Sequence, residues 1–137
     1  MKLGVFSPVL AHMSFEEMVK YLSSIGVDQL EMGAGGCPGK DHFDPEVLLK
    51  DESKIDDIKR ILAENNMSIA AISAHGNPVH PDKKIAKQYH DEFNAAVLLA
   101  EKLGVDTMIG FSGCPGDSEG SIRPNWVTCA WPTDYLD

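Results

Sequence analysis

The feature that most constrains the fold of this chain is a regular alternation of short apolar runs with longer amphipathic stretches. The apolar runs lie at 3–6, 27–32, 68–74 and 105–111, and each has the length of a strand. Strands that are separated by helices favour right-handed crossovers and a parallel sheet. The sequence therefore predicts an α/β protein with four parallel strands alternating with helices.

Three amphipathic stretches carry helix signals. Ser14 with Glu17 three residues later forms a capping box, and Ser53 is expected to cap a second helix. A long third helix is expected to open at 81–82 and to end before Gly104. The glycine-rich segment 33–39 is predicted to be a loop. The expected buried faces are Phe15, Met18, Val19, Leu22 and Ile25 in the first helix, Ile55, Ile58, Ile61 and Leu62 in the second, and Ile85, Tyr89, Phe93, Ala96, Val97, Ala100 and Leu103 in the third.

An internal repeat extends this prediction. Gly-Val-Asp at 26–28, followed by Gly-Cys-Pro-Gly at 36–39, recurs at 104–106 and 113–116, so that Cys37 and Cys114 stand 77 positions apart. The repeat spans two strand–helix units, and eight such units would fill about 275 residues, the usual size of a (βα)8 barrel. We therefore expect the N-terminal half of such a barrel, with a complete small open α/β sheet as the alternative.

The last part of the chain has no periodicity. Residues 112–137 are interpreted as a long loop after the fourth strand, and residues 1–137 as one partial domain. That loop carries both tryptophans, and the missing helix after the fourth strand argues against the open-sheet alternative.

Charge and cysteine content restrict the partners and the compartment. Twelve Lys and Arg face 21 Asp and Glu, a formal charge of −9, which repels nucleic acid and anionic membranes. Three cysteines do not suggest a disulfide framework, and no apolar run approaches the length of a membrane helix. We expect a cytoplasmic protein that binds neither nucleic acid nor membrane.

Polar residues follow the predicted strands, where parallel α/β proteins place their sites. His12 lies after the first strand, Glu31 at the end of the second, His75 after the third and Ser112 after the fourth. The expected substrate-binding residues are His75, Asn77, Glu31, His12, Ser112 and Trp126.

Each of these residues also has an ordinary structural interpretation. His75, with Gly76 leaving room for a ligand beside the backbone, suits proton transfer or metal binding, or it satisfies backbone carbonyls. Glu31 binds a hydroxyl group or pairs with a cation, and Asn77 orients a polyol or forms a turn. Trp126 stacks on a sugar or anchors a loop. His75 and His80 are weak candidates for metal ligands, and no residue is assigned as one.

Several catalytic motifs are absent from the sequence. It contains no Gly-x-Gly-x-x-Gly that opens a helix, no phosphate-binding Gly-Lys-Ser/Thr, no Gly-x-Ser-x-Gly and no Cys-x-x-Cys. Cys37 and Cys114 precede Pro-Gly and are interpreted as turn residues. Dinucleotide, nucleoside triphosphate and serine hydrolase functions therefore lose support.

Four segments together resemble a known family: the first strand ending in Ser-Pro at 7–8, Gly-Val-Asp-Gln-Leu-Glu-Met-Gly at 26–33, Ile-Ser-Ala-His-Gly-Asn-Pro at 72–78 and Gly-Phe-Ser-Gly-Cys-Pro-Gly at 110–116. In this order they resemble the sugar phosphate isomerase/epimerase proteins of the xylose-isomerase-like TIM-barrel superfamily. The resemblance implies a divalent metal, Mn, Mg, Co or Zn, held by carboxylates and a histidine on the second half of the barrel. This chain is then not expected to complete that metal site.

The resemblance implies the N-terminal portion of a metal-dependent sugar or sugar-phosphate isomerase or epimerase, which forms part of the substrate pocket. Two alternatives stay open: a non-catalytic half-barrel that binds a polyol or assembles, and a metal nuclease of the apurinic-endonuclease kind, which the charge disfavours. The resemblance also implies a small sugar or polyol substrate. Because the edges of strands one and four would be unpaired, we expect an oligomer or a complementary half-barrel.

Overall fold

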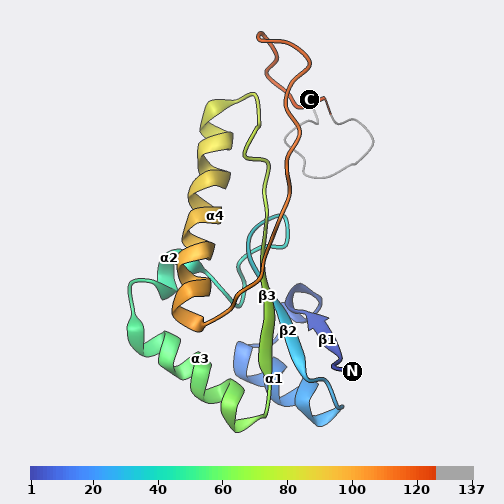
Figure 1. Cartoon of the computed structure of the whole chain (residues 1–137), viewed down its shortest axis with the longest axis vertical. Helices are drawn as coiled ribbons and strands as arrows, with labels where there is room; N and C mark the ends of the chain where they lie inside the picture. Colours follow the sequence, from blue (N-terminus) through green and yellow to red (C-terminus); the bar gives the residue numbers. More distant parts are fainter. Residues whose placement is uncertain (126–137) are drawn as a thin grey trace.

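Four parallel strands, arranged in the order of the sequence, form one sheet in the computed structural model, which describes residues 1–125 (Figure 1). The strands are β1 (Gly4–Phe6), β2 (Gln29–Gly36), β3 (Ser68–His75) and β4 (Met108–Gly110). The predicted parallel α/β architecture is confirmed, and β3 lies between β2 and β4.

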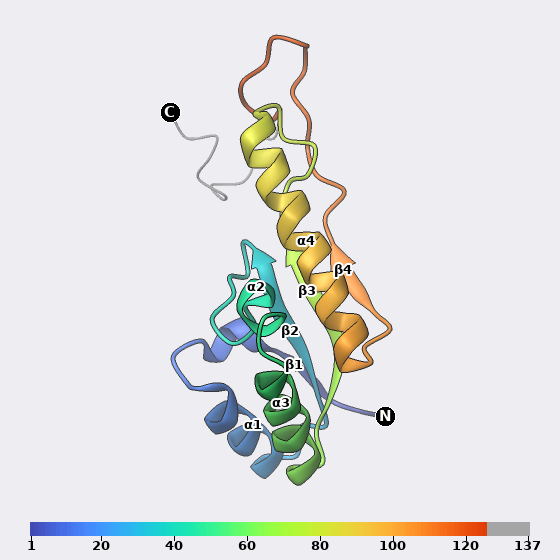
Figure 2. The ribbon, with the colours of Figure 1, turned by 90° about the vertical axis from the view of Figure 1, so that its left-hand side faces the viewer.

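The α-helices lie together on one face of this sheet, in front of the strands in Figure 2. Consecutive parallel strands joined by right-handed crossovers place every connecting helix on the same side. This is the arrangement of half a (βα)8 barrel, in which helices cover the outside and the other face of the sheet lines the interior. The helices are η1 (Ser7–Leu10), α1 (Phe15–Ser24), α2 (Pro45–Leu48), α3 (Glu52–Glu64) and α4 (Lys83–Leu103).

Local capping signals mostly place the helix ends correctly. The capping box of Ser14 and Glu17 is present at the start of α1. Gly104 ends α4 in the left-handed conformation, with φ of 70°. The predicted cap of α3 is wrong, because the carboxylate of Asp51, and not Ser53, accepts the free backbone N–H at that end. The four-residue helix α2 was not predicted.

The core lies between the sheet and the helices. Leu30 and Met32 of β2 and Ile72 of β3 are fully buried there, together with Leu99 of α4. Two residues assigned to buried faces are wrong: Ile25 and Val97 are 57% and 41% exposed. Ile25 follows the last turn of α1, and Val97 lies one position beyond the buried stripe of α4.

Strand β2 continues four residues beyond its predicted end at Met32, so its first glycines form strand and not loop. The glycines permit close packing that side chains would prevent. A Cβ on Gly33 would lie 3.1 Å from Pro8 Cγ, and Gly36, at φ of 68°, lies directly against the backbone of His75. A glycine-rich segment is therefore a strand here because its neighbours approach the backbone closely.

The described residues give one finding about membranes. No helix within residues 1–125 is long and apolar enough to span a bilayer.

Adjacent leucines on α4 test the position of the core. Leu99 is fully buried and Leu98 is 53% exposed. Leu99→Ala should lower the free energy of unfolding by about 2–5 kcal/mol, because it leaves a cavity between α4 and the sheet. Leu98→Ala, the matched control, should change it by less than about 0.5 kcal/mol. Urea unfolding followed by circular dichroism measures both, and equal losses would contradict this packing.

Candidate functional site

The sheet face opposite the helices carries a line of polar residues. Side chains alternate along a strand, and because Ile72 and Ala74 of β3 pack in the core, Ser73 and His75 point to the other face. The Ser73 hydroxyl donates a hydrogen bond to the carboxylate of Glu31 on β2. Glu31 lies near the start of β2 and not at its end as predicted, beside Phe6 of β1 and Ala71 of β3.

The His75 ring lies between two aromatic side chains at the carboxyl end of the sheet. Its ring stacks on that of Phe111, with centroids 4.4 Å apart and planes 7° apart, and the ring of Phe6 lies 6.0 Å away. His75 Nε2 is buried and makes no hydrogen bond within residues 1–125. The end of β3 thus holds a buried imidazole nitrogen that is oriented by packing and whose hydrogen-bonding capacity is not used within residues 1–125.

Burial sets the protonation of this imidazole. Desolvation lowers the pKa of His75 below its ordinary value of 6.5, and the negative charge of Glu31 opposes that shift without cancelling it. His75 is therefore neutral at physiological pH. A neutral imidazole can donate through one ring nitrogen and accept through the other, as hydroxyl recognition or proton transfer requires.

The two copies of the Gly-Cys-Pro-Gly repeat dock on either side of the end of β3. In the first copy the backbone N–H and the thiol of Cys37 both donate to the His75 carbonyl, each at 3.2 Å. In the second copy the amide of Asn77 holds the Cys114 backbone: Oδ1 accepts from the N–H at 2.9 Å, and Nδ2 donates to the carbonyl at 2.8 Å. The Asn77 side chain thus binds a neighbouring turn in this structure.

Gly76 has a different role from the one that the sequence suggested. The ring of Tyr89, on α4, lies where a Cβ of Gly76 would be. The glycine therefore makes room for an aromatic ring of the protein and not for a ligand. The glycine in the sequence correctly indicated a close approach to the backbone, but it did not indicate that the approaching group is the ring of Tyr89.

A buried carboxylate that was not predicted from the sequence lies on the helix side of the sheet, near the end of β2. Glu92 of α4 has a side chain 11% exposed, and it accepts a hydrogen bond from the Gly36 N–H at 2.9 Å. Lys40 Nζ lies 3.9 Å from the same carboxylate. A signal for Glu92 was present, because positions 85, 89, 92, 96, 99 and 103 follow the four-and-three spacing of a buried helix stripe.

The remaining predicted residues differ in burial and position. His12 is exposed between η1 and α1, and Ser112 is exposed just beyond β4, next to Phe111, whose ring stacks on His75. His80 is buried, and its Nδ1 accepts the Asp82 N–H at the start of α4 at 2.9 Å, a capping role. Trp126 lies outside the described residues. The structure brings Glu31 close enough to His75 for its charge to act on the imidazole, and Asn77 follows His75 by two positions.

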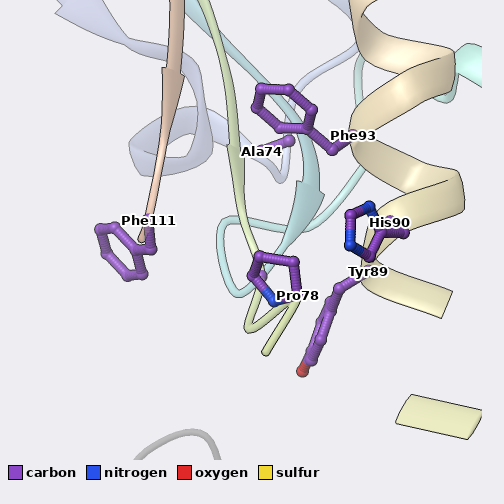
Figure 3. A pocket seen from close by; sticks show the side chains of 7 residues that line it. Ala74, Pro78, Tyr89, His90, Phe93 and Phe111 are labelled. Atoms are coloured by element: carbon purple, nitrogen blue, oxygen red, sulfur yellow. The ribbon is translucent and has the colours of Figure 1, made fainter. Parts of the chain in front are cut away.

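An apolar pocket of about 210 Å³ lies near the same end of β3 (Figure 3). Tyr89, His90 and Phe93 of α4 form one wall, and Ala74, Pro78 and Phe111 lie across from them. Neither Glu31 nor Ser73 lines it. Its lining is mainly apolar, and it shares Phe111 with the candidate site, where the ring of Phe111 stacks on His75.

No metal centre is formed by the part of the chain that the structure describes. Within residues 1–125 no three His, Cys, Asp or Glu side chains gather closely enough to hold a metal ion. His75 and His80 are not joined by a third such ligand in this range. These residues alone therefore do not fit the divalent ion that the resemblance implies.

Comparisons with known proteins agree with the architecture. A family model described as a xylose isomerase-like TIM barrel matches residues 19–132. The chain is 33% identical over its whole length to the uncharacterized protein YfiH of Bacillus subtilis (strain 168), of which it covers 44%. It also resembles the crystal structure of AsbF of Bacillus anthracis, a probable 3-DHS dehydratase involved in petrobactin synthesis, with a TM-score of 0.60 and 15% identity, over 82% of this chain and 39% of that one. The chain thus spans less than half the length of either relative.

The lowered pKa of His75 makes stability depend on pH. A base whose pKa is lower in the folded state resists protonation there, so folding stability falls as pH drops from about 6.5 through the folded pKa. His75→Phe keeps a ring against Phe111 and removes the titration. The difference in unfolding free energy between pH 7.5 and pH 5 should therefore be smaller in the variant than in the wild type. Urea unfolding at both pH values measures it, and equal differences in the two proteins would contradict the assignment.

Proposed function

The chain belongs to the xylose isomerase-like TIM barrel family, and on this basis we propose that it forms the N-terminal portion of a metal-dependent sugar or sugar-phosphate isomerase or epimerase. In this proposal the polar face at the carboxyl end of the sheet supplies part of the substrate pocket. Family and position agree for His75, because barrels of this kind place their sites at the carboxyl ends of the strands, whereas Glu31 lies near the start of β2 on the same face.

The observation that carries the proposal is the Nε2 of His75, which is buried beside aromatic rings and has no hydrogen-bond partner within residues 1–125. A buried polar atom without a hydrogen bond is costly, and a substrate hydroxyl would remove that cost. The adjacent ring of Phe111 is 53% exposed and suits the C–H face of a sugar. Glu31 has a second carboxylate oxygen beyond the one that Ser73 binds, and this oxygen can accept from a further hydroxyl.

The residues described contribute binding and orientation. A divalent ion, Mn, Mg, Co or Zn, is part of the proposal for the whole protein, where it would polarise a carbonyl or hydroxyl group. Since residues 1–125 do not gather the ligands for it, no step is assigned to these residues through a metal. The neutral His75 is suited to hold a hydroxyl proton at Nε2, and Glu31 to fix the orientation of the same substrate.

The fold is compatible with more than one reaction, as the probable dehydratase AsbF illustrates. The choice of isomerisation or epimerisation therefore rests on the resemblance of the sequence segments and is a proposal. Two other functions remain outcomes of the experiment: a non-catalytic module that binds a polyol, and a metal nuclease. The formal charge of −9 is unfavourable for the nuclease.

Calorimetric titration with sugars, sugar phosphates and polyols tests the site, with and without each divalent ion. We expect binding by the wild type, and His75→Phe should weaken it about tenfold, because the ring remains but the hydrogen-bonding nitrogen is lost. Glu31→Gln should also weaken binding, while Leu98→Ala, distant on the exposed side of α4, should not. Equal affinity in the wild type and His75→Phe would contradict the assignment of His75.

The metal arm of the same titration separates the functions. The isomerase or epimerase is supported if affinity for the sugar rises with a divalent ion and if the full-length natural protein converts one sugar into another. Affinity that ignores the ion supports a binding module. Cleavage of DNA at abasic sites, in an assay of the same protein, would support the nuclease and overturn the proposal.

Unpaired strand edges underlie a proposal about partners. In the described sheet β1 and β4 each pair on one side, which leaves backbone groups available for another strand. We propose that they pair with a complementary half-barrel or with another copy of the chain. Sedimentation of the purified 137-residue chain should show association that increases with concentration, and a monomer at every concentration would contradict pairing between copies.

A further inference from the structure

We propose that Glu92 is a positioning residue, which holds the turn at Gly36 and Cys37 from the helix side of the sheet and thereby fixes the end of β3 at His75. Glu92 would serve the site of the proposed function. Its effect on the turn and the ring is measurable without any substrate, so that its failure and the failure of the proposed function are distinguishable.

The first step is the burial of the carboxylate. Burying a charged group is costly unless it is paired and hydrogen-bonded, and a glutamate at a buried position of an amphipathic helix calls for a reason. Both oxygens of Glu92 have partners: Oε2 accepts from the Gly36 N–H at 2.9 Å, and Oε1 accepts from Gln88 Nε2 at 3.2 Å. Lys40 Nζ, at 3.9 Å from Oε1, supplies the opposite charge.

The second step is the contact between the turn and β3. Gly36 has a φ of 68° and lies against the His75 backbone so closely that no side chain fits there. Its neighbour Cys37 donates its N–H and its thiol to the His75 carbonyl. Glu92, Gly36, Cys37 and His75 thus form a continuous series of contacts from the helix layer to the candidate site.

The third step is the fit between α4 and β2. A Cβ on Gly35 would lie 3.3 Å from both Cβ and Oε2 of Glu92, so the helix packs directly on the strand backbone at this point. Lys40 also lies 3.9 Å from Asp44, the residue that caps α2. One carboxylate therefore connects α4, the end of β2 and the segment that leads to α2.

The second Gly-Cys-Pro-Gly turn provides an internal control. Cys114 is held by Asn77 and by a hydrogen bond from its thiol to Asn125 Oδ1 at 2.6 Å, and none of these contacts involves Glu92. The two cysteines therefore report on two turns that are attached to β3 by different side chains.

Alkylation of the cysteines by N-ethylmaleimide, quantified for each site by peptide mass spectrometry, tests the proposal on the full chain. Glu92→Met keeps the length of the side chain and removes the acceptor. It should raise the alkylation rate of Cys37 about tenfold or more, because opening of the turn no longer breaks a hydrogen bond to a charged group. The rate of Cys114 should change less than about twofold in this variant.

Two matched variants separate the acceptor from the charge and from the fold. Glu92→Gln keeps an oxygen for the Gly36 N–H and loses the charge, so the Cys37 rate should stay within about threefold of the wild type. Glu101→Met, on an exposed position of the same helix, should change neither rate. Asn77→Ala should show the reverse pattern, with Cys114 accelerated and Cys37 unchanged.

The ionisation of His75, followed by NMR, is a second readout that a merely structural role would not move. Release of the turn in Glu92→Met should hydrate the ring and raise the pKa of His75 toward 6.5. Glu92→Gln keeps an acceptor for the Gly36 N–H and should leave that pKa unchanged, because the charge that acts on His75 is that of Glu31.

Three outcomes would overturn the proposal: a folded Glu92→Met with unchanged Cys37 rate and His75 pKa, equal acceleration of Cys37 and Cys114, or Glu92→Gln behaving like Glu92→Met. If Glu92→Met does not fold, hydrogen exchange of the Gly36 amide in the wild type decides. Protection comparable to the interior of β2 supports the proposal, and exchange at the rate of an exposed amide overturns it.

Discussion

The contact of backbone on backbone between Gly36 and His75 is the constraint on which the carboxyl edge of the sheet depends. A side chain can change its rotamer to relieve a close approach, but a main-chain carbonyl held in a strand cannot. The contact therefore requires glycine at position 36, with a positive φ, and it determines where β2 ends and the next segment begins. Cys37 is placed by the same contact, because its N–H donates to the carbonyl on which Gly36 packs.

The two faces of the sheet have different roles: one packs in the apolar core, and the other carries the polar candidate site. On the helix side, β2 and β3 contribute apolar side chains, and α4 packs on them with Ala96, Leu99 and Ala100. On the other side the same strands carry Glu31, Ser73 and His75. Because strand alternation creates both faces at once, the packing of Ile72 and Ala74 in the core turns Ser73 and His75 to the polar face, where Phe111, just after β4, stacks on the His75 ring.

The sequence predicted what depends on short-range signals and missed what depends on distant neighbours. The parallel order of strands follows from the alternation of strands and helices along the chain. The capping box at Ser14 and the helix end at Gly104 follow from residues within one turn of each position. The extent of β2 depended on His75, 39 residues beyond Gly36, which no local pattern shows.

The candidate site was predictable to a similar degree. His75 was found because strand ends carry sites in parallel α/β folds, and Glu31 was found as a charge in an apolar strand, although at the wrong end of it. The burial of Glu92 was visible as a charge in a helical stripe, but its partner on β2 was not. The role of Asn77 required the second turn to be in place.

The repeat in the sequence is a repeat of glycine conformation, while the contacts of its two copies differ. Gly26 and Gly104 both end helices at positive φ, 86° and 70°, and Gly36 and Gly113 both begin the Cys-Pro-Gly turns at 68° and 85°. The positive φ angles of these glycines are therefore repeated together with the amino-acid sequence.

The attachments of the two turns differ, however: the first turn binds a main-chain carbonyl and is held from behind by a buried carboxylate, whereas the second is held by a side-chain amide. The duplicated glycines determine the backbone conformation of each turn. The residues that bind each turn determine how it is attached to the rest of the protein. His75 has no counterpart in the repeat, because it lies at the end of β3, the strand between the two copies. Both turns attach near this end of β3.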